Sequence, residues 1–96
     1  MKHFIIEIKY LVPFPEIEIV LQEHRSFLQK GYDAGMLLCS GPQEPKTGGL
    51  IVARGESMEN IKDYFKDDPF LKHKVAEYRY IEFNPVKYLN FLKEWI

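Results

Sequence analysis

Hydrophobic and polar residues alternate at the start of the chain and then change to a helical spacing. Residues 3–11 place Phe4, Ile6, Ile8 and Tyr10 on one face and charged residues on the other, which predicts a half-buried strand. Two prolines then interrupt the alternation, and a proline is tolerated in the first turn of a helix. A helix is therefore predicted from about residue 16 to a point between residues 31 and 35.

A histidine lies within the apolar stripe of this predicted helix. The stripe follows the i, i+3, i+4 spacing of a core-facing surface and consists of Ile17, Val20, Leu21, Leu28 and Gly31. His24 falls in the middle of it and is expected to point inward. Two interpretations stay open: a core histidine bonded to a backbone carbonyl, or a histidine that takes part in a site.

Two short apolar runs follow, at residues 36–40 and 49–54, and the polar turn between them predicts an antiparallel hairpin. Ser57 stands where an N-cap belongs, and the spacing of Met58, Ile61, Tyr64 and Phe65 predicts a second helix. The residue before a proline is pushed out of the α region, so Asp68-Pro69 is expected to end this helix.

Residues 72–74 are expected to form a basic, exposed connection to a fourth strand over residues 75–83. This strand places Tyr78 and Tyr80 on one face and Arg79, Ile81 and Phe83 on the other. Asn84 and Pro85 then resemble the start of a last helix over residues 85–96, where Phe91 and Trp95 are expected to pack in the core or at an interface.

The element order β-α-β-β-α-β predicts one α+β domain over residues 1–96, with a core at 1–83 and an extra C-terminal helix. Two crossovers joined by a hairpin give a four-stranded antiparallel sheet with both helices on one face, the ferredoxin-like arrangement. The other face of the sheet then needs cover, which a partner subunit supplies, so a homodimer is expected.

Composition narrows the classes of function. A net charge of -1 over 96 residues gives no electrostatic reason to expect nucleic acid or an anionic membrane as partner, and no segment approaches the length of a membrane span. Cys39 is the only cysteine, which excludes an intramolecular disulfide and fits a reducing, cytoplasmic location. In an apolar strand, Cys39 is expected to be an inert core thiol.

The turn Asp67-Asp68-Pro69-Phe70 is the second candidate for chemistry. Two carboxylates at the carboxyl end of a helix oppose its dipole. Ordinary turn chemistry explains an Asp before a Pro. A carboxylate beside an inward-facing histidine would instead orient the ring as a general acid/base requires. The spacing leaves both interpretations open.

Other polar residues give weaker signals. Ser40 lacks the surroundings of a nucleophilic serine and is expected to be a polar contact. His3 and His73 lack the spacing of metal ligands, so no metal is expected. Tyr10 and the strand tyrosines are candidates to line the region between the sheet and a partner, although sheet packing explains them equally.

Three pieces of the sequence carry a family resemblance over roughly residues 1–83. They are the helix histidine His24 before RSFLQKGYDAGMLLCSGPQ, the segment GGLIVARGESMENIKDYFKDDPF, and the strand YRYIEF. Together they resemble the YCII-related (YciI-like) family of small dimeric α+β barrel proteins. By this resemblance a His–Asp pair falls on His24 and Asp68. Ser40, Gly41, Pro42, Phe70 and Tyr10 are the candidate residues to contact a substrate.

The resemblance has two limits. The segment Val12-Pro13-Phe14-Pro15 is apolar where many relatives carry acidic and arginine residues, so substrate contacts there are not transferred. The segment after residue 84 also lies outside the resemblance.

Some proteins of this broad fold group, such as the chloromuconolactone dehalogenases, act on small cyclic acids.

Two functions of different classes follow. The first is a small enzyme that needs no cofactor and uses His24, oriented by Asp68, for isomerase, lyase or dehalogenase chemistry on a small organic acid. Arg25 and Arg54 are the candidates to hold the anion. The second is a non-catalytic binding or accessory domain in which the pair anchors a ligand or only stabilises the fold. A cavity beside His24 favours ligand or catalysis, and a sealed core favours a structural role.

Overall fold

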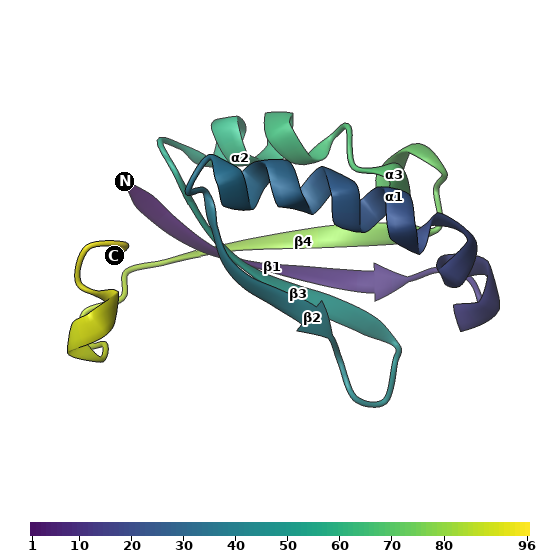
Figure 1. Cartoon of the computed structure of the whole chain (residues 1–96), viewed down its shortest axis with the longest axis horizontal. Helices are drawn as coiled ribbons and strands as arrows, with labels where there is room; N and C mark the ends of the chain where they lie inside the picture. The colour runs from purple at the N-terminus through teal and green to yellow at the C-terminus, as the bar shows by residue number, and fades with distance from the viewer.

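A four-stranded antiparallel sheet carries the α-helices on one face (Figure 1). The computed structural model describes residues 1–96. The strand order is β2-β3-β1-β4, which confirms the predicted α+β, ferredoxin-like arrangement. The elements are β1 Lys2–Tyr10, α1 Phe14–Asp33, β2 Leu37–Pro42, β3 Gly48–Gly55, α2 Met58–Phe65, α3 Pro69–Lys72, β4 Ala76–Phe83 and the 3-10 turn η1 Asn90–Leu92.

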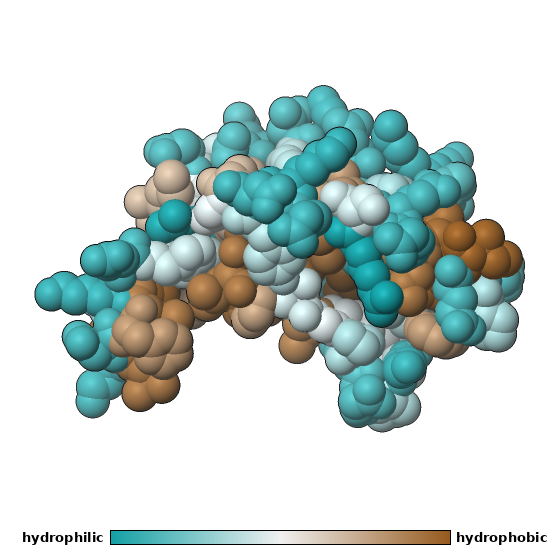
Figure 2. Space-filling view, in the orientation of Figure 1, coloured by the Kyte–Doolittle hydropathy of each residue, from teal (hydrophilic) through white to brown (hydrophobic).

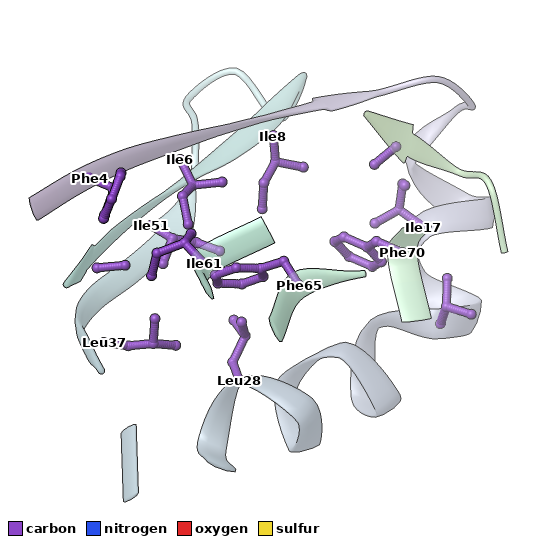
Figure 3. Close-up of a cluster of buried hydrophobic side chains, with 13 residues drawn as sticks. Phe4, Ile6, Ile8, Ile17, Leu28, Leu37, Ile51, Ile61, Phe65 and Phe70 are labelled. Carbon is purple, nitrogen blue, oxygen red and sulfur yellow. The ribbon is translucent and has the colours of Figure 1, made fainter. Parts of the chain in front are cut away.

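The core lies between this sheet and the helices. Alternate residues of β1 point toward the helices, as predicted, and Phe4 and Ile6 are completely buried (Figure 3). From the helix side, Leu28 of α1 and Phe65 at the end of α2 point into the same cluster (Figure 3). The predicted stripe of α1 is confirmed except at Leu21, because Ile17, Val20, His24, Leu28 and Gly31 are buried, whereas Leu21 is only partly buried and borders the cavity.

The hairpin passes close to β1. A Cβ atom added at Gly48 would lie 1.9 Å from the backbone oxygen of Ile8, so only glycine fits at this position beside the central strand. Gly41, in the other strand of the hairpin, has nothing within 4 Å of such an atom. The close approach at Gly48 fixes where the hairpin leaves the sheet.

A separate turn of helix follows α2. Ser57 caps α2 as predicted, and its hydroxyl accepts a hydrogen bond from the amide of Asn60 at 3.0 Å. Pro69 then begins α3, and Asp68 is the N-cap of this new helix. The view of Asp68 as a residue opposing the end of a helix is therefore wrong, because its carboxylate accepts the amide of Phe70 at a helix start.

The expected C-terminal helix over residues 85–96 is wrong. Residues 84–89 form no regular element and only the three residues of η1 are helical. Several residues of this segment are weak helix formers, and a helix of about 12 residues is marginal without tertiary packing. We call residues 84–96 the C-terminal hook, because Figure 1 shows them leaving the end of β4 and turning back on themselves beyond that end of the sheet.

The C-terminal hook is tied to the sheet through Trp95. Its indole nitrogen donates to the backbone oxygen of Gly35 at 3.2 Å, and its ring lies 5.6 Å from that of His3. Arg54 donates to the backbone oxygen of Trp95 at 2.9 Å and lies 5.2 Å from the centre of the indole. The expectation that Trp95 packs is confirmed, whereas Phe91 is 79% exposed.

Cys39 is exposed, so the expectation of a core thiol is wrong. The pairing of β2 with β3 shifts register between Leu37 and Cys39, as a β-bulge does. Leu37 keeps its place in the core, whereas the edge strand turns outward after the shift. A simple alternation along the sequence does not reveal the extra residue.

None of the helices is long and apolar enough to cross a bilayer.

Candidate functional site

Asp68 lies at the centre of a buried hydrogen-bond network. Its side chain is completely buried and accepts bonds from Nδ1 of His24 at 2.8 and 3.1 Å and from the hydroxyl of Tyr78 at 2.5 Å. The backbone amide of Phe70 donates to the same carboxylate at 3.0 Å. Three donors from α1, α3 and β4 therefore converge on one carboxylate, so its position is held from three sides.

Local sequence explains why Asp68 reaches His24. Pro69 holds Asp68 in an extended conformation, with φ -62° and ψ 128°, and the side chain folds over the first amides of α3. The next residue, Phe70, stacks on the imidazole of His24, with ring centres 3.8 Å apart and planes inclined by 3°. The imidazole is thus fixed by a carboxylate at one edge and an aromatic ring on one face.

The second nitrogen of His24 has no partner within the protein. A carboxylate that already takes bonds from a hydroxyl and an amide acts as acceptor, so Nδ1 of His24 carries the proton that it donates. Nε2 then carries the lone pair. Asp68 is sealed in the core whereas His24 borders a cavity, so the edge of the ring bearing Nε2 reaches that cavity.

The cavity has a volume of about 490 Å³ and opens between α1 and the base of the β2–β3 hairpin. Every residue expected beside a substrate borders it, and Asp68 lies behind His24 outside the lining. The lining consists of Ile8, Tyr10, Phe14, Glu18, Leu21, His24, Arg25, Leu28, Ser40, Gly41, Pro42, Lys46, Gly49, Leu50, Ile51 and Phe70. The space beside His24 is thus an open cavity and not a sealed core.

Phe14, Glu18, Leu21 and Lys46 line the cavity although none was predicted as a site residue, whereas Arg25 was predicted as a candidate to hold an anion. Phe14, Glu18, Leu21 and Arg25 recur at helical spacing along α1 and form a second stripe beside the buried one. The sequence alone could therefore have indicated this second stripe. Lys46 comes from the hairpin turn, and its ammonium lies 5.0 Å from the centre of the Phe14 ring, a contact that no local pattern indicates.

Other expectations need correction. Arg54 is not near the cavity, because its guanidinium donates to the backbone oxygens of Gly35 and Trp95 at the far end of the sheet. Tyr78 and Tyr80 face the helices and pack against Phe65, so they do not line a region between the sheet and a partner. Ser40 borders the cavity, and its hydroxyl lies 2.6 Å from that of Tyr32.

The tyrosines around Asp68 are held in their protonated form. Burial first, and then the nearby carboxylate of Asp68, raise the pKa of Tyr78 far above its ordinary value. The same two causes raise the pKa of Tyr80 to about 12. Burial alone raises the pKa of Tyr10 at the cavity wall. Tyr78 therefore stays a hydrogen-bond donor to Asp68 throughout the neutral range.

These raised pKa values predict a loss of stability in alkali. An unfolded tyrosine ionises near pH 10, whereas folded Tyr78 keeps its proton, so its stabilisation is complete below pH 10 and declines above it. Each such phenol lowers the unfolding free energy by about 1.4 kcal/mol per pH unit in that range. Urea unfolding from pH 8 to 11 is expected to show a shallower alkaline decline for Tyr78→Phe than for the wild type. Equal slopes would contradict the role given to Tyr78.

The site can accept or deliver a proton at one fixed atom, Nε2 of His24. His24 offers Nε2 to the cavity while Asp68 holds the opposite side of the ring, and Arg25 and Lys46 border the same space. No three His, Cys, Asp or Glu side chains come together as metal ligands would. The chemistry that these residues offer is proton transfer beside an anion.

Comparison with known proteins agrees with the fold. The structure of 5-chloro-2-hydroxyhydroquinone dehydrochlorinase (TftG) from Burkholderia phenoliruptrix AC1100, in complex with 2,5-dihydroxybenzoquinone, is similar with a TM-score of 0.69. The two proteins share 18% sequence identity over 85% of this chain and 91% of the other. No curated protein sequence matches the chain. The sequence profile of the YCII-related domain matches residues 2–84, which include both His24 and Asp68. The chain therefore belongs to the YCII-related family.

Proposed function

We propose that the protein is a small enzyme that uses His24 as general acid/base, with Asp68 as its positioning residue, on a small organic acid. The reaction is of isomerase, lyase or dehalogenase type and needs no cofactor. One observation carries the proposal: Nδ1 of His24 is held by a buried carboxylate while the ring borders a cavity. A histidine oriented in this way suits proton transfer near neutral pH.

The chemistry needs only one mobile proton. Nε2 of His24 takes a proton from a hydroxyl or an activated C–H group of the substrate, and the resulting imidazolium is stabilised by Asp68. The electron pair left on the substrate moves toward an adjacent carbon. A leaving group such as chloride departs with the electrons of its bond, or the same proton returns at another carbon. The first outcome is elimination and the second is isomerisation.

Two cations at the cavity are suited to hold an anion. Arg25 on α1 and Lys46 on the hairpin both border the cavity, and neither forms an ion pair within the protein. Glu18 is the one acidic side chain in the lining. A carboxylate or enolate between the two cations would be stabilised by charge-assisted hydrogen bonds. This supports a substrate that is negatively charged.

The walls favour a planar substrate. Tyr10, Phe14 and Phe70 border the cavity, and the ring of Tyr10 meets those of Phe14 and Phe70 at centre distances of 6.1 Å. Aromatic rings of this kind provide flat apolar surface beside the polar end of His24. The 2,5-dihydroxybenzoquinone bound to TftG is planar and acidic, and we propose that ligands of this class fit here.

The second candidate is a non-catalytic domain that binds a small ligand. Its support is that the network around Asp68 joins α1, α3 and β4, so the pair also stabilises the fold. The cavity beside His24 opposes a purely structural role, because a sealed core would serve that purpose. Binding without turnover would favour this second function.

Binding of a planar anion is the first test of the site. In an NMR titration with 2,5-dihydroxybenzoquinone we expect shifts of His24 and Phe70 signals, and Arg25→Gln or Lys46→Gln is expected to weaken binding about tenfold each. Lys30→Gln is the matched control, since Lys30 lies on α1 outside the cavity lining and should leave the affinity unchanged. Equal affinity of all four proteins would contradict the proposed anion site.

The proposal also covers the oligomeric state and the cellular compartment of the protein. We propose a homodimer, with the face of the sheet opposite the helices as the contact surface. We also propose a reducing, cytoplasmic compartment, which the exposed thiol of Cys39 suits.

A further inference from the structure

Tyr78 is the only side chain besides His24 that bonds the carboxylate of Asp68. Its hydroxyl donates to Oδ2 at 2.5 Å, while Nδ1 of His24 lies 2.8 Å from Oδ1. Tyr78 belongs to β4 and does not border the cavity, so it makes no contact with a ligand there. Any influence of Tyr78 on the chemistry of the site must therefore pass through Asp68.

The surroundings of Asp68 make its charge sensitive to each hydrogen-bond donor. The side chain is completely buried, so protein groups replace water as its solvation. Figure 2 shows hydrophobic atoms gathered at the end of the molecule where α1 begins, which is also where the cavity borders Tyr10 and Phe14. Burial and the nearby carboxylate raise the pKa of Tyr78, so its phenol stays a donor at neutral pH. The bond from Tyr78 thus stabilises the ionised carboxylate over the whole neutral range.

We propose that Tyr78 is a second positioning residue, which acts through Asp68 to lower the proton affinity of His24, so that the ring is free to accept a proton at neutral pH. This inference rests on the proposed role of His24 as general acid/base. A carboxylate beside an imidazole favours the imidazolium, which has no lone pair left to accept a proton. The hydroxyl of Tyr78 and the amide of Phe70 take up part of the carboxylate's charge and weaken this effect.

The direction of the effect does not depend on where the added proton resides. Asp68 and His24 are in direct contact and titrate as a coupled pair. The pair carries one negative charge before it takes up the proton and no net charge afterwards, whichever group holds the proton. The bond from Tyr78 stabilises the negatively charged form more strongly. Loss of that bond therefore raises the pH at which the pair takes up its proton.

The other ionisable groups near the pair are placed differently. Tyr64 on α2 donates its hydroxyl to the backbone oxygen of Phe27 at 2.8 Å, and Tyr80 on β4 makes no hydrogen bond to Asp68. The remaining groups border the cavity and share its solvent, namely Tyr10 of β1, Glu18 and Arg25 of α1, and Lys46 of the hairpin. Tyr80→Phe is thus a matched control, because Tyr80 lies two positions after Tyr78 on the same face of β4 and packs on the same Phe65.

An NMR titration of Tyr78→Phe tests the inference without any need for turnover. Phenylalanine keeps the ring that packs against Phe65 and removes only the hydroxyl. We expect the midpoint of the His24 titration to rise by about one pH unit above that of the wild type, which is about a tenfold gain in proton affinity. In the enzyme assay, the acid limb of kcat/KM against pH should move by the same amount. Tyr80→Phe should keep the wild-type midpoint.

A Tyr78 that only stabilises the fold would give a different result. Tyr78→Phe would then lower the unfolding free energy and leave the His24 midpoint unchanged, and this outcome overturns the proposal. An equal shift in Tyr80→Phe would also overturn it, because that variant leaves the bond to Asp68 intact. If Tyr78→Phe does not fold, a ring-fluorinated tyrosine at position 78 keeps the bond and is a more acidic donor, so it should lower the midpoint. A rise or no change would contradict the proposal.

The same experiments separate this inference from the proposed enzyme. A shifted midpoint of His24 in a protein that turns over no small acid supports the role of Tyr78 and overturns the enzyme. Turnover with an unshifted midpoint in Tyr78→Phe supports the enzyme and overturns the role of Tyr78.

Discussion

His24→Gln is expected to lower kcat/KM by a factor of about 10² to 10⁴, the usual contribution of a general acid/base. Glutamine keeps a polar side chain at the cavity but cannot exchange a proton near neutral pH. Chloride release from 5-chloro-2-hydroxyhydroquinone is the first assay, because the fold is shared with the dehydrochlorinase that acts on it. The loss should appear in kcat, since the ring acts on the reacting atoms.

The control for His24 is His73→Gln. His73 lies on the surface, beside Glu23 at 3.6 Å, and its replacement should leave the rate unchanged. A His24→Gln protein that keeps the wild-type rate would refute the acid/base role. If the wild type binds 2,5-dihydroxybenzoquinone but converts no small acid, the non-catalytic function is supported instead.

Asp68→Ala is expected to lower the unfolding free energy by about 3–5 kcal/mol, because it removes the acceptor of three buried donors. The ring of His24, the hydroxyl of Tyr78 and the amide of Phe70 would all lose their partner. The cavity left in the core adds to the loss. Urea unfolding at pH 7 measures the change directly.

The adjacent aspartate offers a matched control. Asp67 is exposed and lies 3.9 Å from Lys72, so Asp67→Ala should change the unfolding free energy by less than about 0.5 kcal/mol. Asp68→Asn keeps the shape of the side chain and one acceptor oxygen, and it should fall between the two. Similar stability of Asp67→Ala and Asp68→Ala would show that the network does not hold the fold together.

The arrangement of the elements could be predicted because each depends on local periodicity. The inward direction of His24 follows from its place in a stripe at helical spacing, and the cap at Ser57 follows from residue type. The meeting of His24 and Asp68 across 44 positions does not follow from spacing. It depends on where α3 packs against α1, and only the family resemblance indicated it.

Two of the wrong expectations, the C-terminal helix and the core position of Cys39, share a physical cause. The C-terminal hook has apolar residues at helical intervals, yet a short helix is marginal by itself, and Trp95 instead contacts His3, Arg54 and Gly35. Cys39 lies in an apolar run, but the bulge after Leu37 turns it outward. In both cases long-range packing overrides the local pattern.

The position of the site on rigid elements explains why its geometry is precise. His24 lies on a 20-residue helix and Tyr78 on a strand paired along its length to β1. Asp68 is fixed by the cap of α3. Only Lys46 and the hairpin belong to a turn. We therefore expect the proton-transfer group to be preorganised and the anion-binding side to adapt to the ligand.

The protonation of the two nitrogens of His24 tests the account most directly. Long-range ¹H–¹⁵N correlation spectra of the labelled protein, assigned with His24→Gln, should show Nδ1 carrying the proton and Nε2 without one near pH 8. Adding 2,5-dihydroxybenzoquinone should shift the Nε2 resonance of His24 and leave His73 unchanged. A proton on Nε2, or a His24 ring that does not respond to this ligand, would contradict the proposed site.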